Sequence, residues 1–216
     1  MTHALMWSGG KDSYLALAHA RRQGLAVSTL VNFYDGATGR VRFHATRREL
    51  IAAQGFSLGL RLLQYPTAPD TYERVFEAAL NDLSRSGLHG AVFGNIHLAD
   101  VRAWFEGRVR AAGLEHVEPL WSSRSSDLLA EFIDSGAAAV ITCVETAKLP
   151  ATWLGRALDE EFATDIARHP EVDPCGERGE YHSFVYAGPL FTEPVQWRPG
   201  PIHEEGGFAQ LELLSR

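Results

Sequence analysis

Residues 4–18 read Ala4-Leu5-Met6-Trp7-Ser8-Gly9-Gly10-Lys11-Asp12-Ser13-Tyr14-Leu15-Ala16-Leu17-Ala18. The first four are apolar and predict a short buried strand, whereas the last five suit a helix. Two glycines lie between them, so the chain is expected to pass from a strand through a tight turn into a helix. The N–H groups of a first helical turn lack partners within the helix, and the helix dipole adds partial positive charge there. This order of elements predicts a phosphate-binding site.

The side chains of this loop agree with an anionic ligand. Its glycines let the backbone come close to an anion, Lys11 adds a positive charge, and Ser8 and Ser13 add hydroxyl donors. Asp12 would repel a phosphate alone, so its carboxylate fits best beside a metal ion bound to that phosphate. The spacing matches neither G-x-x-x-x-G-K-[ST] nor G-x-G-x-x-G. The alternative is a glycine turn that only caps the helix.

The composition of the 216 residues is that of a soluble globular protein, with 45% hydrophobic and 22% charged residues. This length suits one large domain, or one domain with a small appendage. No apolar run approaches the ~20 residues that span a membrane, and the N-terminus lacks the basic segment and cleavage site of a secretory signal. We therefore expect a cytoplasmic protein without a membrane partner.

Cysteine content and charge exclude further classes of protein. Cys143 and Cys175 are too few for a disulfide framework or a zinc site, so we expect reduced thiols. The net charge of −7 argues against a broad nucleic-acid surface. A local basic cluster consists of Arg40, Arg42, Arg47 and Arg48. We interpret it as a solvated face in preference to a site for an anionic substrate.

Strand and helix patterns alternate along most of the chain. Strands are expected at residues 3–7, 26–33, 60–64, 90–94, 115–118 and 138–144, and helices at residues 11–23, 47–54, 71–86, 99–112, 127–134 and 156–168. Thr46 is the expected N-cap of the second helix, with Glu49 completing a capping box. Such alternation predicts an α/β fold with a mostly parallel sheet and helices on both faces.

Ligands of such a sheet bind at the carboxyl ends of its strands, near a topological switch point. The segments that follow predicted strands are Ser8, residues 33–40, Gly94-Asn95 and residues 143–145. We expect these segments to converge on one edge of the sheet.

The pattern changes after Leu149. The tail is rich in proline and glycine, with extended segments at residues 181–186 and 208–214. We therefore predict a domain over residues 1–150 and a small mixed or β-rich extension over residues 151–216, packed near the phosphate site.

The tail contains a second motif, Gly176-Glu177-Arg178-Gly179-Glu180-Tyr181-His182-Ser183. Glu177 and Glu180 are held by a glycine-rich turn, which suits binding of Mg²⁺, of a cationic group or of an amine. A surface hairpin with solvated acids is the alternative, and on this stretch alone the two interpretations stand equal.

Together, the two motifs resemble those of the diphthine–ammonia ligase family. Residues 8–13 match the SGGxDS loop of the PP-loop ATP pyrophosphatases, and residues 176–183 match G-E-x-G-E-[FY]-x-[ST]. Segments similar to the family also occur at Phe43-His44-Ala45-Thr46, Gly94-Asn95-Ile96, Glu118-Pro119-Leu120-Trp121, Trp153-Leu154-Gly155 and Pro189-Leu190-Phe191. The resemblance spans nearly the whole chain and disfavours a mere helix cap at the loop. It implies an adenine nucleotide alpha hydrolase-like fold.

The resemblance implies an AMP-forming carboxylate–ammonia ligase that uses ATP and Mg²⁺. A substrate carboxylate attacks the α-phosphorus of ATP, pyrophosphate leaves, and ammonia then displaces AMP from the acyl-adenylate. Residues expected to bind ATP are Ser8, Gly9, Gly10, Lys11, Asp12, Ser13, Gly94 and Asn95, and Asp12 is also expected to orient the metal. Residues expected to be catalytic are Lys11, Asp12, His44, Glu177 and Glu180, and those expected to bind the substrate are Gly176, Gly179, His182 and Ser183.

Asn95 departs from the family pattern, which usually has an aspartate at this position. The expected partners are ammonia and a carboxylate on a small molecule or a modified protein side chain. The identity of that acid and the oligomeric state, a homodimer included, stay open. Two other functions also stay open: an ATP-binding regulatory module without turnover, and another PP-loop chemistry such as thiolation, which the lack of a C-x-x-C pair disfavours.

Overall fold

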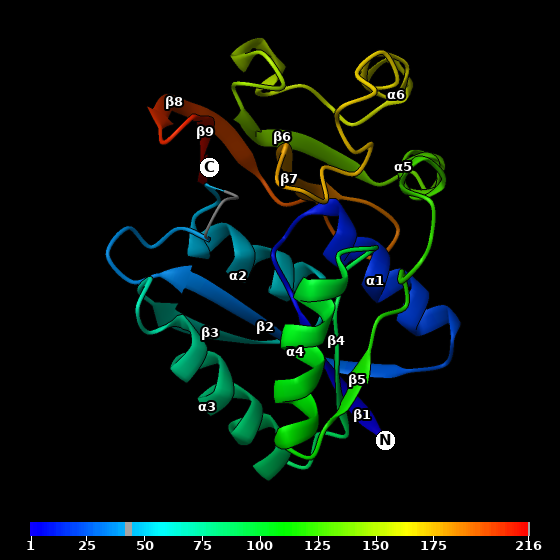
Figure 1. The fold of residues 1–216 in the computed structure, drawn as a ribbon, viewed down its shortest axis with the longest axis vertical. Helices are drawn as coiled ribbons and strands as arrows, with labels where there is room; N and C mark the ends of the chain where they lie inside the picture. The colour runs from blue at the N-terminus through cyan, green and yellow to red at the C-terminus, as the bar shows by residue number, and fades with distance from the viewer. Residues whose placement is uncertain (42–44, 216) are drawn as a thin grey trace.

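The computed structural model of the chain describes residues 1–41 and 45–215. A five-stranded sheet forms the first part of the fold, with strand order β3-β2-β1-β4-β5 and parallel pairing throughout. Its strands are β1 (Thr2–Met6), β2 (Ala26–Asp35), β3 (Arg61–Thr67), β4 (Gly90–Val92) and β5 (Glu115–Val117). The predicted α/β class with a parallel sheet is confirmed (Figure 1).

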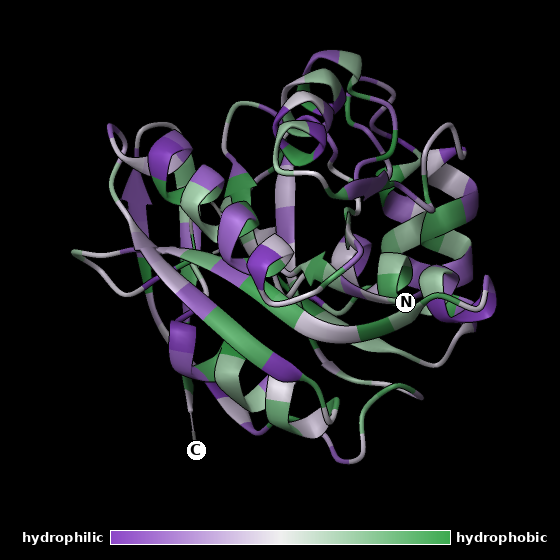
Figure 2. Cartoon of the chain, turned by 90° about the horizontal axis from the view of Figure 1, so that it is seen from below, coloured by the Kyte–Doolittle hydropathy of each residue, from purple (hydrophilic) through white to green (hydrophobic). Residues whose placement is uncertain are grey.

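Helices cover both faces of this sheet, as predicted. They are α1 (Lys11–Arg22), α2 (Arg48–Ser57), α3 (Tyr72–Arg85), α4 (Ala99–Ala111) and α5 (Ser125–Asp134). On one face, α3 and α4 contribute Phe76 and Val109 to the core. On the opposite face, α1 and α2 contribute Leu15 and Ile51. Apolar and polar segments alternate along the helices in Figure 2, which is the pattern of helices that bury one side.

A second, antiparallel sheet has the strand order β7-β6-β9-β8. Its strands are β6 (Ala138–Glu145), β7 (Tyr181–Ala187), β8 (Trp197–Glu205) and β9 (Phe208–Ser215). The tail is β-rich as predicted, but the prediction that residues 138–144 join the parallel sheet is wrong. The strand is buried along nearly its whole length, and such an apolar run fits the centre of either kind of sheet. The pattern of apolar residues therefore could not show which strands pair with β6.

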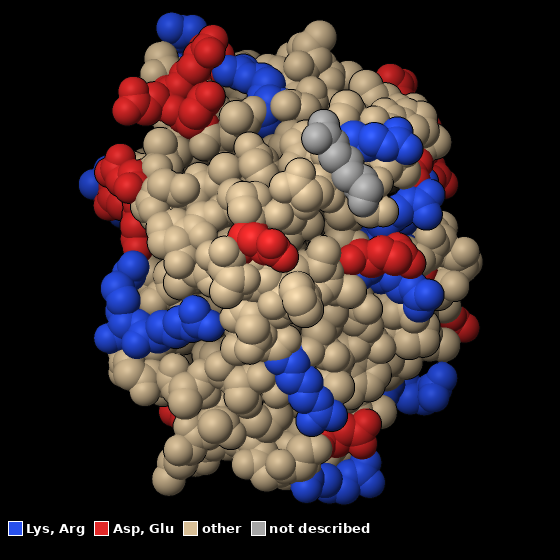
Figure 3. All heavy atoms as spheres, turned by 180° about the vertical axis from the view of Figure 1, so that it is seen from behind, with Lys and Arg blue, Asp and Glu red and all other residues tan. Residues whose placement is uncertain are grey.

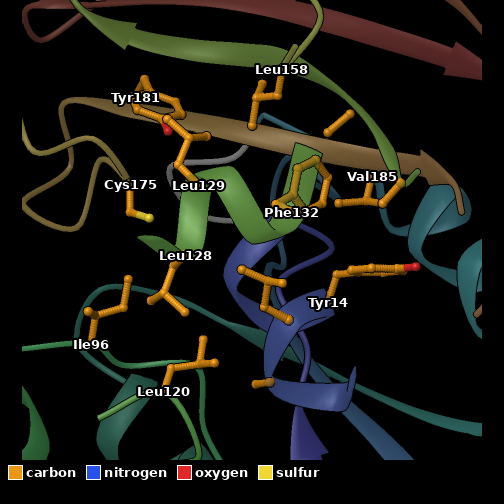
Figure 4. Packing of buried hydrophobic residues seen from close by; sticks show 14 of the residues in the cluster. Tyr14, Ile96, Leu120, Leu128, Leu129, Phe132, Leu158, Cys175, Tyr181 and Val185 are labelled. Carbon is orange, nitrogen blue, oxygen red and sulfur yellow. The ribbon is translucent and has the colours of Figure 1, made fainter. Parts of the chain in front are cut away.

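Helix α1 lies between the two sheets and joins their cores. Figure 4 shows Tyr14 of α1 near Phe132 of α5, and their ring centroids are 5.9 Å apart. Val185 and Tyr181 of β7 close the same apolar cluster from the second sheet. The short helices η1 (Ala151–Trp153) and α6 (Glu160–Ile166) pack beside this sheet, and α6 is shorter than the predicted helix at residues 156–168.

The basic cluster of the sequence is largely engaged in ion pairs. Arg40 and Arg47 both pair with Glu212 of β9, whose side chain is only 6% exposed. The solvated-face interpretation is therefore wrong for Arg40, whose side chain is 25% exposed, whereas Arg47 is 43% exposed although it links the start of α2 to the second sheet. Arg48 is nearer to that interpretation because its side chain is 49% exposed, and Arg42 lies outside the described residues.

The start of α2 differs from the prediction. Arg47 is the N-cap residue and makes no side-chain capping hydrogen bond, so the predicted capping box of Thr46 and Glu49 is wrong. Glu49 instead accepts a hydrogen bond from Arg48 Nε at 3.1 Å. Ion pairs with neighbouring elements here outweigh the local capping preference.

Charged side chains of both signs share the surface. On the face in Figure 3, lysines and arginines are interspersed with acidic side chains, with uncharged surface between them. In the part of the chain that the structure describes, every helix is too short or too polar to cross a lipid bilayer.

Candidate active site

A pocket of about 240 Å³ lies where the order of the parallel sheet reverses, between β1 and β4. This is the topological switch point at which open α/β sheets bind ligands. The pocket is lined by Met6, Ser8, Gly10, Lys11, Asp12, Ser13, Phe93, Gly94, Asn95, Phe105, Gly176, Glu177, Tyr181, His182 and Ser183. The two sequence motifs, far apart in the chain, therefore form one pocket. Within the described chain, residues 33–40 and 143–145 do not line it, although we expected them at the same edge.

Two glycines let the loop after β1 take its course. Gly9 has φ +87°, and a Cβ at this position would lie 2.5 Å from Ile51 Cδ1 and 2.7 Å from Gln54 Oε1. Gly94 approaches the first turn of α1 so closely that a Cβ would lie 2.9 Å from the carbonyl carbon and oxygen of Asp12. A larger residue at Gly94 would displace the helix N-terminus from the end of β4, and one at Gly9 would be strained at its positive φ and would press on α2.

Gln54 of α2 holds the loop in place and was not predicted. Its side chain is fully buried. Gln54 Oε1 accepts a hydrogen bond from Trp7 Nε1 at 2.7 Å, and Gln54 Nε2 donates to the carbonyl oxygens of Gly9 at 3.0 Å and Val185 at 2.6 Å. One amide group thus ties the loop to the second sheet. The sequence could have indicated Gln54 because it is a polar residue among the apolar positions of a helix, and a buried polar group must have hydrogen-bond partners.

The two serines of the loop bond within it. Ser13 Oγ donates to the carbonyl oxygen of Gly10 at 2.8 Å. Ser8 Oγ accepts from the Gly10 N–H at 3.3 Å and lies 3.4 Å from Ser13 Oγ. Both hydroxyl groups therefore help to shape the turn while they line the pocket.

Lys11 connects the two motifs. Its side chain is 2% exposed, and its N–H donates to Ser183 Oγ at 3.2 Å. Lys11 Nζ donates to both carboxylate oxygens of Asp12, at 2.9 and 3.0 Å, and to the carbonyl oxygen of Cys175. Burial would lower the pKa of Lys11, but the Asp12 carboxylate raises it well above its ordinary value, so the ammonium stays charged.

Glu177 presents a carboxyl group whose protonation changes near neutral pH. Its Oε1 accepts a hydrogen bond from the Ile96 N–H at 2.9 Å, which fixes it against the loop after β4. Burial raises the pKa of Glu177 to about 7, and the nearby charges of Asp12 and Asp173 add to that increase. A carboxyl group with such a pKa can accept and release a proton at physiological pH.

Glu180 does not line the pocket among the described residues, in contrast to its predicted catalytic role. Its side chain is fully buried, and its two carboxylate oxygens accept the N–H groups of Asp173 and Arg178, both at 3.0 Å. Glu180 therefore shapes the loop that carries Glu177. Gly179 likewise lies away from the pocket and provides the turn with φ +89°.

Replacing Glu180 with glutamine tests this structural role. The amide keeps the shape of the side chain but offers only one acceptor oxygen, so one buried loop N–H loses its partner. We expect the free energy of unfolding to fall by about 1–3 kcal/mol. Urea denaturation of Glu180→Gln and the native chain measures the difference, and equal stabilities would contradict the role.

Asp173 is a second positioning residue that sequence reasoning missed. Its carboxylate accepts the Cys175 N–H at 2.8 Å and the Ser125 hydroxyl at 2.9 Å, and it lies 3.6 Å from His97 Nε2. These contacts anchor the second motif to the start of α5. An aspartate before a proline is too common in loops to be singled out from sequence alone.

The side-chain amide of Asn95 donates a hydrogen bond to a buried carboxylate, that of Glu118. Asn95 Nδ2 donates to Glu118 Oε1 at 2.7 Å, and Arg102 Nε lies 3.2 Å from Glu118 Oε2. The Glu118 side chain is only 2% exposed. An aspartate in place of Asn95 would set two carboxylates against each other, so the asparagine suits this neighbour. Its amide is engaged beside the pocket.

The remaining predicted residues fall into two groups. Gly176, His182 and Ser183 line the pocket, whereas His44 lies outside the described residues. Gly176 has φ +68°, and a Cβ there would lie 2.6 Å from the Tyr181 carbonyl oxygen. The glycine therefore lets the second motif fold back on the start of β7.

Both cysteines are inert in this arrangement. Cys143 is fully buried and Cys175 is 1% exposed. Burial raises the pKa of each thiol to about 12, so neither forms a thiolate at neutral pH. The expectation that they are reduced, unpaired thiols agrees with the structure, in which both are free.

Acidic groups outweigh basic ones around the pocket. Burial raises the pKa of Asp12, and the charge of Asp173 adds to that rise while Lys11 opposes it. Asp12 and Glu177 both line the pocket, and carboxylate oxygens are the ligands that Mg²⁺ prefers. The Asp12 carboxylate, 30% exposed, is therefore the group of this pocket suited to a magnesium ion.

Comparisons with known proteins agree with this interpretation of the two motifs. The model of the diphthamide synthase N-terminal domain matches residues 1–116, and that of the diphthamide synthase C-terminal domain matches residues 124–209. A diphthine–ammonia ligase of Bos taurus is 30% identical over 240 residues, which cover 99% of this chain and 90% of that protein. A diphthine–ammonia ligase of Homo sapiens is 29% identical over 166 residues, covering 74% of this chain and 62% of that protein.

One solved structure resembles the fold. It is described as a predicted subunit of tRNA methyltransferase from Methanocaldococcus jannaschii, and it covers 88% of this chain and 98% of its own. The TM-score is 0.49 and the sequence identity 13%, which is too low to support a statement about function.

Proposed function

Because the chain belongs to the diphthamide synthase family, we propose that it is an ATP-dependent ligase that joins ammonia to a substrate carboxylate. One observation carries the proposal: a helix N-terminus suited to phosphate and a carboxyl group with a pKa of about 7 line the same pocket. The helix N-terminus suits the activation of a carboxylate by a triphosphate. The Glu177 carboxyl suits a nitrogen nucleophile that must lose a proton. The curated relatives bear the name of such a ligase.

The first turn of α1 supplies the donors for the phosphate groups. The N–H groups of residues 12 and 13 have no carbonyl of α1 in front of them, whereas that of Lys11 donates to Ser183 Oγ, and the helix dipole favours negative charge at this end. The buried ammonium of Lys11 adds charge below the turn. Because these groups are held in place before the reaction, they stabilise the charge that builds on the departing pyrophosphate.

Asp12 is the residue that would hold Mg²⁺ in this pocket, and Glu177 stays free to act as a base. When bound, the ion neutralises phosphate charge and makes the α-phosphorus a better electrophile. Asp12 is suited to this task because its side chain is 30% exposed toward the pocket although it pairs with Lys11.

Glu177 is proposed to deprotonate the nitrogen nucleophile. Ammonium gives a proton to the Glu177 carboxylate, and the lone pair of the resulting ammonia attacks the carbonyl carbon of the acyl-adenylate. The bond between that carbon and the phosphate oxygen breaks, AMP leaves with the electron pair, and the nitrogen releases its second proton to solvent to give the amide. The hydrogen bond from the Ile96 N–H keeps Glu177 oriented toward the loop through these steps.

We propose a protein-borne carboxylate as the substrate. The relatives are named for diphthine, a modified histidine that carries a carboxylate. Thiolation is the weaker alternative, because both cysteines are buried and burial raises the pKa of their thiols to about 12.

Exchange of labelled pyrophosphate into ATP tests the first half-reaction. With Mg²⁺ and diphthine-bearing elongation factor 2, the chain is expected to catalyse exchange without ammonium. Replacement of the substrate by unmodified elongation factor 2 is the control and is expected to stop exchange. A chain that binds ATP but shows no exchange with the modified protein would be a regulatory module instead.

A further inference from the structure

Three metal-ligating side chains meet at the end of the parallel sheet opposite the pocket. His3 of β1, His89 directly before β4 and Glu115 of β5 place one nitrogen or oxygen atom each within 4.8 Å of one another. The pocket lies at the carboxyl ends of the strands, whereas these residues stand at the amino ends. They are far from any step of the proposed ligase reaction, so a function of this cluster is independent of that reaction.

The register of three neighbouring strands produces the cluster. His3 and Glu115 are both paired with Gly90 of β4. The His89 N–H donates to the Thr2 carbonyl oxygen at 2.8 Å, and the Glu115 N–H donates to the His89 carbonyl oxygen at 3.0 Å. Backbone hydrogen bonds on both sides thus fix the positions of the three residues.

Gly90 leaves the space in which two of the side chains meet. A Cβ at this position would lie 2.8 Å from His3 Cδ2 and 3.0 Å from Glu115 Cβ. Any other residue on the middle strand would separate the imidazole from the carboxylate. The glycine therefore belongs to the construction of this cluster.

The distances suit ligands around one ion, and they are long for charge-assisted hydrogen bonds, although the His3–Glu115 contact is within hydrogen-bond range. Glu115 Oε2 lies 3.3 Å from His3 Nε2 and 3.4 Å from His89 Nε2. Charge-assisted hydrogen bonds are about 2.7–2.9 Å long. Tetrahedral zinc with bonds of about 2.0–2.1 Å holds its ligands about 3.4 Å apart. Elsewhere in this chain, His19 Nε2 lies 2.9 Å from Glu131 Oε2, the distance of an ordinary hydrogen bond.

His3 is buried and therefore fixed in position, whereas His89 and Glu115 leave the cluster open to solvent on one side. The His3 side chain is 3% exposed; its Nε2 faces Glu115, whereas its Nδ1 has no hydrogen-bond partner among the described residues. The side chains of His89 and Glu115 are 46% and 52% exposed. Two imidazoles, one carboxylate and a position open to water form the ligand set of an accessible zinc site.

We propose that His3, His89 and Glu115 bind a zinc-class divalent ion that links the amino ends of β1, β4 and β5. Imidazole nitrogen selects zinc or cobalt over magnesium, so this site is distinct in chemistry from the carboxylate of Asp12 in the pocket. The three ligands come from three different strands. A bound ion therefore stabilises the edge of the sheet where the strands begin.

Metal titration of the tag-free full chain tests the site. Calorimetry with Zn²⁺ is expected to show one ion per chain, and Co²⁺ is expected to give the visible absorption of a tetrahedral site. His89→Ala and Glu115→Gln are expected to bind Zn²⁺ at least about 100-fold more weakly, because loss of a ligand exceeds loss of an outer partner. Both positions are half-exposed, so circular dichroism is expected to show an unchanged fold.

His19→Ala is the matched control, since it removes a histidine from a histidine–glutamate pair that has no third ligand among the described residues. This variant is expected to keep the native zinc affinity. Zn²⁺ is also expected to raise the melting temperature of the native chain and of His19→Ala, but not of His89→Ala. Equal zinc affinity in His89→Ala and the native chain, or no binding by the native chain, would show a carboxylate merely shared by two imidazoles and would overturn the proposal.

Discussion

Glu177→Gln is expected to abolish amide formation while leaving pyrophosphate exchange in place. The variant keeps an acceptor for the Ile96 N–H, so the loop geometry is preserved, but it cannot take a proton from ammonium. Loss of general base catalysis lowers the rate by roughly 10²–10⁴-fold. Single-turnover measurement of the amide product gives this rate, and the exchange assay reports the first half-reaction separately. A full amidation rate in Glu177→Gln would remove Glu177 from the mechanism.

The pH dependence of the reaction follows from the same residue. The base form of Glu177 is lost as the pH falls through its pKa of about 7, so amide formation is expected to decline tenfold per pH unit below that value. The native chain is expected to show this decline with a constant ratio of ammonium to substrate. Residual amidation by Glu177→Gln depends on free ammonia alone, so it is expected to fall steadily with pH and to lack the change of slope near pH 7. A decline of the same shape in both proteins would assign it to another group.

The thermal stability of Glu177→Gln shows whether its loss of amidation comes from the missing base or from misfolding. Because burial raises the pKa of Glu177 from its ordinary 4.5 to about 7, the carboxyl stabilises the fold only when it is protonated, and that contribution disappears as the pH rises through 7. A shift of this size corresponds to at most about 3 kcal/mol above pH 7. Glu177→Gln is therefore expected to melt at a higher temperature than the native chain at pH 8, with a smaller difference at pH 5.

Lys11→Met is expected to destabilise the fold and to abolish ATP turnover. The substitution removes the cation beside Asp12 and the donor to the Cys175 carbonyl oxygen. Loss of one partner of a buried ion pair costs about 3–5 kcal/mol, and the partial exposure of Asp12 reduces that value toward its lower end. Urea denaturation measures the loss, and calorimetry with ATP measures the binding.

A double variant distinguishes charge from shape at this position. Lys11→Met combined with Asp12→Asn removes both charges, so it is expected to regain part of the stability that Lys11→Met loses. It is expected to remain inactive, since neither the ammonium nor the metal-binding carboxylate is present. A double variant no more stable than Lys11→Met would show that Lys11 acts through packing alone.

Local signals in the sequence were enough to predict the parallel sheet. Strands β1 to β4 contain short apolar runs bounded by glycine or by polar loops, and each strand of the sheet, including the more polar β5, is followed by a helix. Strand β8 escaped prediction because Pro199 and Pro201 interrupt it and its residues are mostly exposed. It lies at the edge of the second sheet, where proline is tolerated.

The parts of the candidate site that consist of neighbouring residues in the sequence could be predicted. The loop before α1 and the second motif could be identified because chemistry and turn geometry coincide in a few neighbouring residues. Gln54 and Asp173 could not, because their role is set by neighbours distant in the chain. Glu177 and Glu180 look equivalent in sequence, and only burial and loop contacts assign one to the pocket and the other to the loop.

Formation of an amide from a carboxylate and ammonia, at the expense of ATP, is the reaction proposed for this pocket. Mass spectrometry of diphthine-bearing elongation factor 2, incubated with the chain, ATP, Mg²⁺ and ammonium, is its decisive test. We expect a mass decrease of about 1 Da on the modified histidine, the net change when NH₂ replaces OH, with one AMP and one pyrophosphate released per amide. An unchanged mass while ATP is consumed, or an ADP product in place of AMP, would contradict the proposed reaction.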